Sequence, residues 1–372
     1  MLHQSEKFNF EITPGPIPND GILFVDHEKD DMSGHLGHAM VEYDDGKILC
    51  FYPDCSGKYI DGHNAVGYMS YKRSEDGGET WSEPQPYEYS KQLYDMNSGV
   101  TCFTEKAVRT ADGGILMFNL ICCTRIMWEY WEPYWVSYTK SMDGGKTWST
   151  PKMLITNNDR NKLGRAYDVK VIGDKIYMLY CGSSDETQFE NFYQLYVSCD
   201  NGESFEKVSD LKFNKNCFYG ALVELNDGGL AAYVYSPDDE YSLPYCISYD
   251  EGKTWSDIKT TPFVKMIRNP QIAKFKDTYF CFGRSGNNDP HELHLTPEKG
   301  NGVVYTSADG INWDEGQYMR MRVAQAGSYS NTLITGTLNP DKKERLLYQT
   351  SFAYRMHCTN ILHWWIDAEE RK

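Results

Sequence analysis

The sequence predicts an all-β protein: a six-bladed β-propeller of four-stranded antiparallel blades with Asp-box turns, formed by residues 1–372 as a single domain. Three observations predict it. One turn motif recurs five times, a second series of short turns separates apolar runs, and the composition is rich in aromatic residues (14%) and glycine (31 residues). Aromatic residues favour strands, and glycine favours the tight turns that join many short strands.

The recurring motif, the Asp box, reads Ser-x-Asp-x-Gly-x-Thr-Trp. Its copies are SEDGGETW at 74–81, SMDGGKTW at 141–148, SCDNGESF at 198–205, SYDEGKTW at 248–255 and the shorter SADGINW at 307–313. Asp and Ser side chains bond neighbouring backbone amides, and glycine accepts positive φ, so each copy predicts a hairpin turn whose final aromatic ring packs on the sheet. These acidic residues are therefore expected to be structural.

A second turn precedes each box and separates two apolar runs. The turns are Asp45-Gly46, Asp112-Gly113, Gly173-Asp174, Asp227-Gly228 and Lys276-Asp277. Each unit therefore predicts strand A, a tight turn, strand B, a longer loop, strand C, an Asp box and strand D. Such units bury their faces on one another in a ring, which removes exposed sheet edges.

A sixth unit, SYSNTLITG, RLLYQTSF and TNILHWWID, ends before any box. An N-terminal segment, either KFNFEIT or GILFVDH, is expected to supply its fourth strand and fasten the ring. Seven blades remain the alternative if residues 1–33 hold more strand.

Composition and charge exclude several classes of function. The formal charge of −16, from 37 basic and 53 acidic residues, opposes binding to nucleic acid, which needs Lys and Arg at the phosphates. No apolar run has the length of a membrane helix, so no membrane association is expected. The first residues, MLHQSEKFNFEIT, lack the layout of a signal peptide, which predicts a cytoplasmic protein, or a secreted one if a leader was removed. The 11 cysteines form no CxxC pair, so buried reduced thiols are expected.

Propeller topology predicts where chemistry gathers. The A–B turns and the Asp boxes lie at one end, so the starts of the A strands and the B–C loops form the other end around the central channel. Polar and aromatic residues at those positions are the candidates. The catalytic candidates are His38, Asp61, His63 and Tyr329, and the substrate-binding candidates are His35, Arg125, Trp128, Arg165, Tyr219, Arg268, Arg284 and Arg355.

Two of these candidates lie in the aromatic segment RIMWEYWEPYW, which begins at Arg125 and includes Trp128. Its rings either stack on sugar faces or cover a gap between blades. The spacing of the histidines matches no standard zinc pattern, so neither a metal nor another cofactor is predicted.

The five boxes, the stretch YKRSEDGGETWSEP and the pair GSYSNTLITG and RLLYQTS resemble the sialidase superfamily. The resemblance implies a glycoside hydrolase acting on a glycan, with a tyrosine nucleophile paired with a glutamate, an aspartate as acid/base and three arginines that clamp the sugar carboxylate. Tyr329 falls at the position of the nucleophile, and Arg284 at that of an arginine in the fifth blade. Asp61 or His63 falls near the acid/base.

Other positions depart from the family pattern. No arginine precedes Arg73, the fourth-blade loop SPDDEYSLPY is acidic, and Gln349 occupies the glutamate position of the closing blade. Histidines His35, His38 and His63 stand in the first blade instead, where they could transfer protons near neutral pH. This pattern resembles propeller-fold polysaccharide lyases that cleave uronates by β-elimination. A non-catalytic glycan-binding propeller is the third alternative, and the sequence defines no oligomeric state.

Overall fold

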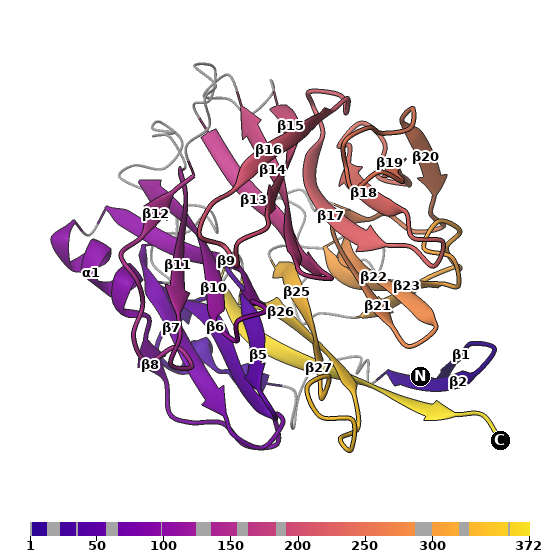
Figure 1. Cartoon of the computed structure of the whole chain (residues 1–372). Coiled ribbons are helices and arrows are strands. Elements are labelled where there is room, and N and C mark those ends of the chain that lie inside the picture. Colours follow the sequence, from indigo (N-terminus) through magenta and orange to yellow (C-terminus); the bar gives the residue numbers. More distant parts are fainter. Residues whose placement is uncertain are drawn as a thin grey trace.

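The protein is described by a computed structural model covering residues 2–12, 23–34, 36–56, 66–97, 99–123, 135–154, 163–183, 191–286, 300–319, 327–355 and 358–372. Within these ranges the chain forms six antiparallel sheets. The first strands of successive sheets contact one another in a closed cycle, β5 to β9, β13, β17, β21, β25 and back to β5. The sheets are therefore the six predicted blades of a propeller (Figure 1).

Five blades run from the inner A strand outward to strand D. Blade 1 holds β5 (Met40–Asp44), β6 (Lys47–Ser56), β7 (Gly67–Ser74) and β8 (Gln85–Pro86), with β4 (Met32–Ser33) beside β6; blade 2 holds β9 (Val100–Arg109), β10 (Ile115–Cys123), β11 (Trp135–Ser141) and β12 (Lys152–Met153). Blade 3 holds β13 (Leu163–Ile172), β14 (Lys175–Ser183), β15 (Asn191–Ser198) and β16 (Glu206–Leu211); blade 4 holds β17 (Phe218–Glu224), β18 (Leu230–Tyr235), β19 (Ser242–Ser248) and β20 (Lys259–Pro262). Blade 5 holds β21 (Arg268–Phe275), β22 (Thr278–Ser285), β23 (Asn301–Ser307) and β24 (Gln317–Met319).

Blade 6 joins the two ends of the chain. Its strands β25 (Gly327–Thr335), β26 (Arg345–Arg355) and β27 (Cys358–Glu370) continue into β2 (Phe8–Ile12) and β1 (Leu2–Gln4), and β3 (Leu23–Val25) also pairs with β27. Figure 1 shows this N-terminal hairpin beside the long final strand. Both candidate N-terminal segments thus pair with β27, and β2 takes the place of the missing fourth strand.

Two short helices lie among the strands of the described chain. Helix α1 (Glu88–Met96) connects blade 1 to blade 2, and the 3-10 turn η1 (His27–Lys29) precedes β4. No helix in the described ranges is long and apolar enough to cross a membrane.

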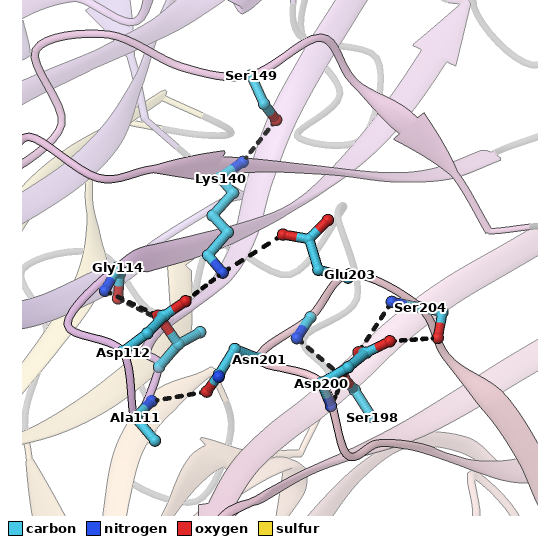
Figure 2. A network of polar contacts seen from close by, with 12 residues as sticks. Ala111, Asp112, Gly114, Lys140, Ser149, Ser198, Asp200, Asn201, Glu203 and Ser204 are labelled. Carbon is cyan, nitrogen blue, oxygen red and sulfur yellow. Dashed lines mark hydrogen bonds and ion pairs between the residues drawn. The ribbon is translucent and has the colours of Figure 1, made fainter.

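The third Asp box shows how the motif closes a turn (Figure 2). The Ser198 hydroxyl donates to Asp200 at 2.7 Å and accepts the Gly202 amide at 2.9 Å. The Asp200 carboxylate also accepts the Ser204 amide at 3.0 Å and its hydroxyl at 2.6 Å. Partial burial opposes ionisation, but these hydrogen bonds lower the pKa of Asp200 to about 2. The carboxylate is occupied by the turn, as predicted.

The same box also ties blade 3 to blade 2. Asn201 accepts the Ala111 amide at 3.1 Å, and the Lys140 ammonium contacts Asp112 at 2.7 Å and Glu203 at 3.5 Å (Figure 2). The closing aromatic residue of every box packs against a buried core cluster; these are Trp81, Trp148, Phe205, Trp255 and Trp313. Much of the acidic and aromatic content therefore stabilises the fold.

The thiols follow the prediction with one exception. All nine cysteines that the described ranges report are free, and eight are buried; Cys199 is exposed. Reduced cysteines act here as small apolar core residues.

Candidate active site

β-Bulges shape the upper face of the propeller, the end where the A strands begin. The register against strand B shifts near the start of β17, β21 and β25 and in the middle of β9 and β13. The shifts fall at Glu105, Tyr167, Tyr219, Asn269 and Tyr329. An extra residue bends the strand and re-aims a side chain, and bulges are over-represented beside active sites. Tyr219 and Asn269 also adopt left-handed φ angles of 41° and 53°.

Two of these bulge residues meet. The Tyr219 hydroxyl donates to the Tyr329 hydroxyl at 3.4 Å, and Arg165 Nη1 donates to the Tyr219 hydroxyl at 3.1 Å. The Tyr219 ring packs between Tyr167, at 4.9 Å between ring centroids, and Tyr235, at 6.1 Å. Tyr329 is 9% exposed, so its hydroxyl lies at the floor of the upper face.

Two further arginines complete the group. Arg268 Nη2 donates to the Tyr235 hydroxyl at 2.9 Å, and its Nε lies 3.2 Å from Glu240. The Arg284 guanidinium lies over the Tyr329 ring, 5.5 Å from its centroid. Arg284 is 7% exposed, and its Nε has no hydrogen-bond partner among the described residues.

We call these six residues, Arg165, Tyr219, Tyr235, Arg268, Arg284 and Tyr329, the tyrosine–arginine cluster. Burial raises the pKa of Tyr219 well above its usual value; Tyr329 adds to the rise and Arg165 opposes it. Burial also raises the pKa of Tyr235, against Arg268. Both phenols are therefore neutral at physiological pH, while the guanidinium groups stay charged. The cluster is a local positive site in a chain of charge −16.

Five of the predicted residues come together in this cluster: Arg165, Tyr219, Arg268, Arg284 and Tyr329. Arg355 contacts Asp31 and the Cys358 thiol instead, and its side chain is half exposed. The predicted residues His35, Asp61, His63, Arg125 and Trp128 lie outside the described ranges.

His38 is buried, with 3% exposure. Its Nδ1 lies 3.3 Å from Gln349 Nε2, which also donates to the Phe51 carbonyl at 2.8 Å. Gln349 Oε1 lies 2.8 Å from Nε2 of His363, on the neighbouring strand. Gln349 thus joins two histidines between blades 1 and 6.

Two residues of the site, Tyr235 and Glu240, were not predicted. Tyr235 ends strand B of blade 4, and Glu240 belongs to the acidic loop that follows this strand. The sequence indicates only that this loop lacks the arginine of the family pattern. In the structure the loop supplies Glu240, the carboxylate partner of Arg268. Glu105 lies at the blade 2 bulge, and burial raises its pKa against the opposing charges of Arg165 and Lys106. No group of metal-ligating side chains occurs in the part of the chain that the structure describes.

Six antiparallel blades, Asp-box turns and a polar cluster on the upper face define an Asp-box β-propeller. Residues 134–340, more than half of the chain, match the model of the BNR repeat-like domain. The chain therefore belongs to the BNR repeat-like family. No curated protein sequence matches it.

Solved structures share the fold at low sequence identity. A Dyadobacter fermentans protein of unknown function is 13% identical with a TM-score of 0.67, and the match covers 94% of this chain and 97% of that one. The Hadza microbial sialidase Hz136 is 12% identical with a TM-score of 0.67, over 94% of this chain and 68% of that one. Trypanosoma rangeli sialidase in complex with sialic acid is 12% identical with a TM-score of 0.62, over 95% and 60%. Likeness at this identity concerns the fold alone.

Proposed function

We propose that this protein is a carbohydrate-active enzyme that cleaves a glycosidic bond next to an acidic sugar, with the chemistry centred on Tyr329. The observation that carries the proposal is the position of Tyr329 between a hydroxyl donor, Tyr219, at 3.4 Å and a buried guanidinium, Arg284, over its ring. Sialidases among the structural neighbours support the substrate class.

The cluster places a hydrogen-bond donor at the Tyr329 oxygen and a cation over the Tyr329 ring. A hydrogen bond donated to a phenolate stabilises the charged form, and so does a cation close to it. Tyr219 supplies the hydrogen bond, and Arg284 supplies the cation. Because a partly buried site has a low effective dielectric, both interactions are stronger there than in water.

Arg284 also suits the carboxylate of the sugar. Its planar guanidinium can bond a carboxylate with two parallel hydrogen bonds, and none of the described residues accepts a hydrogen bond from its Nε. Arg165 and Arg268 are already engaged with Tyr219 and Tyr235, so they hold the two phenols in place. In this scheme Arg284 orients the sugar above Tyr329.

Hydrolysis then proceeds in two steps. The Tyr329 hydroxyl loses its proton to solvent water, and its oxygen bonds to the anomeric carbon while the glycosidic bond breaks. The leaving oxygen takes a proton from an acid, for which Asp61 and His63 are the predicted candidates, and the Tyr329 oxygen regains a proton from water once the sugar is released. Water, deprotonated by the same group, then releases the sugar from Tyr329.

A second candidate, a uronate lyase, is favoured by one observation: a phenol, that of Tyr219, hydrogen-bonds the Tyr329 hydroxyl. A tyrosine can remove the proton next to a uronate carboxylate while Arg284 stabilises the resulting charge, and an acid protonates the leaving oxygen. The product then carries a carbon–carbon double bond and no water is consumed.

A panel of glycosides and oligosaccharides with sialic or uronic acid residues tests the proposal. Hydrolysis releases the intact acidic sugar, which incorporates one oxygen from ¹⁸O-labelled water. Elimination gives an ultraviolet-absorbing unsaturated product without the label. Binding of an acidic glycan with no product in either assay would overturn both candidates and leave the glycan-binding propeller.

A further inference from the structure

A cavity of about 540 Å³ occupies the central channel on the lower face, the end that carries the A–B turns. The inner strands of all six blades line it. Apart from the residues of β5, its walls come from the later halves of these strands, as at Arg109, Ile172 and Lys274. Four residues of the tyrosine–arginine cluster lie near the starts of inner strands instead; they are Arg165, Tyr219, Arg268 and Tyr329. The cavity is therefore separate from the proposed active site, and its volume falls in the range of small-molecule sites.

A buried polar group borders the inner part of this cavity. Lys106 Nζ donates to Gln271 at 2.5 Å and Asn331 at 2.9 Å, and lies 3.2 Å from Asp168. These four side chains belong to blades 2, 3, 5 and 6, and each residue is at most 8% exposed. The three donors of the Lys106 ammonium thus have three partners.

The charges in this group do not balance. Asp168 accepts the Val169 amide at 3.0 Å and the Leu222 amide at 2.8 Å, and contacts both Lys106 and Lys170, the latter at 3.4 Å. Two ammonium groups therefore share one carboxylate. Burial lowers the pKa of Lys106; Asp168 and, more weakly, the neighbouring Glu105 oppose this, whereas Lys170 adds to it. An excess positive charge in a confined channel is costly unless an anion joins it.

The other acidic residues of the cavity wall do not remove this excess. Glu42 accepts the backbone amides of Gly46, Gly336 and Thr337. Glu224 lines the cavity together with two cationic side chains, Arg109 and Lys274.

Lys170 has the capacity to bind a ligand. Its ammonium donates to the Ile272 carbonyl at 3.2 Å and contacts Asp168, which accounts for two of its three donors. Its side chain is 29% exposed and lines the cavity.

We propose that the lower channel is a binding site for a small oxyanion, an organic carboxylate or a phosphate, held by the Lys170 ammonium. With the anion bound, the two ammonium groups of Lys106 and Lys170 face two negative groups, the Asp168 carboxylate and the anion. The site does not depend on the reaction proposed for the upper face.

Thermal unfolding of the full chain tests the site. The midpoint Tm is measured in increasing sodium phosphate or sodium acetate, with sodium chloride holding the ionic strength constant. A ligand that binds only the folded state raises Tm in a concentration-dependent way. We expect such a rise with at least one anion in the wild type and in K170R, and its loss in K170M. The exposed Lys253 of the fourth Asp box gives the matched control, K253M, which should keep the rise.

The pattern of responses identifies the ligand. A rise with acetate alone indicates a carboxylate site, and a rise with phosphate alone a phosphate site. Phosphate also stabilises proteins through exclusion from their surface, an effect that K170M would share. An equal rise in K170M, or no rise with either anion in the wild type, would overturn the proposal. Titration calorimetry of the wild type with inorganic phosphate and acetate gives a second readout that does not depend on the folding of a variant.

Discussion

Arg268 and Arg284 stand directly opposite each other in the pairing of β21 and β22. Like charges across a strand pair repel, so each guanidinium needs its own stabilising partner. Arg268 has Tyr235 and Glu240, whereas the ring of Tyr329 is the described partner of Arg284. A negatively charged substrate group next to Arg284 would complete this arrangement.

Replacing Arg284 should therefore weaken the use of acidic substrates. We expect R284M to lower kcat/KM by about ten- to a hundredfold, because a hydrogen bond to a charged group contributes about 1.5–3 kcal/mol. Steady-state kinetics on the best acidic substrate measures this. R355M is the matched control, since Arg355 pairs with Asp31, and it should retain activity. An equal loss in both variants would place Arg355 in the site as well and remove the special role of Arg284.

The closure of the ring makes a prediction about stability. Phe10 of β2 is fully buried and packs against Phe275 and Phe280 of blade 5, with centroids 5.9 and 5.2 Å away. F10A should lower the free energy of unfolding by about 3–5 kcal/mol, because it leaves a cavity in the core. Urea denaturation checks this, with F10L as the milder variant. A change below about 1 kcal/mol would mean that β2 is dispensable for closure.

The architecture could be predicted from the sequence because an Asp box encodes its turn locally. Ser198, Asp200 and Gly202 close one within five positions. The side of the channel on which Arg165 and Tyr219 lie also follows from strand order alone. Their contacts do not, because the meeting of Tyr219 with Tyr329 depends on bulges in β17 and β25 that no residue pattern reveals.

The surroundings of the histidines likewise could not be predicted from the sequence. Strand order puts His38 at the upper end of blade 1, but whether it faces the channel depends on long-range partners. Gln349 and His363 come from strands more than 300 residues further along the chain, and they enclose it. The sequence alone could not predict this network, since each partner is separately plausible as a surface residue.

The buried histidines predict a pH dependence of stability. Burial lowers the pKa of His363 well below its usual value, and Lys72 and His38 add to the effect. Below a pH of about 6.5, the ordinary value for histidine, the unfolded chain binds a proton that the folded chain excludes, so the free energy of unfolding falls as pH falls. The slope from one such group is about 1.4 kcal/mol per pH unit.

Urea denaturation at a series of pH values checks this slope. H363Q removes the titrating ring and should flatten the profile between roughly pH 6.5 and 5. An unchanged profile in H363Q would mean that His363 is not the group responsible.

The most direct measurement of the account is the turnover of Y329F with the acidic substrate that the wild type uses best. The substitution removes only the hydroxyl that lies 3.4 Å from Tyr219. We predict a loss of kcat by a factor of about 10²–10⁴ with a folded protein, and full activity in the control Y249F, whose tyrosine is exposed on an Asp-box turn. Wild-type turnover by Y329F would contradict the claim that Tyr329 is the centre of the chemistry.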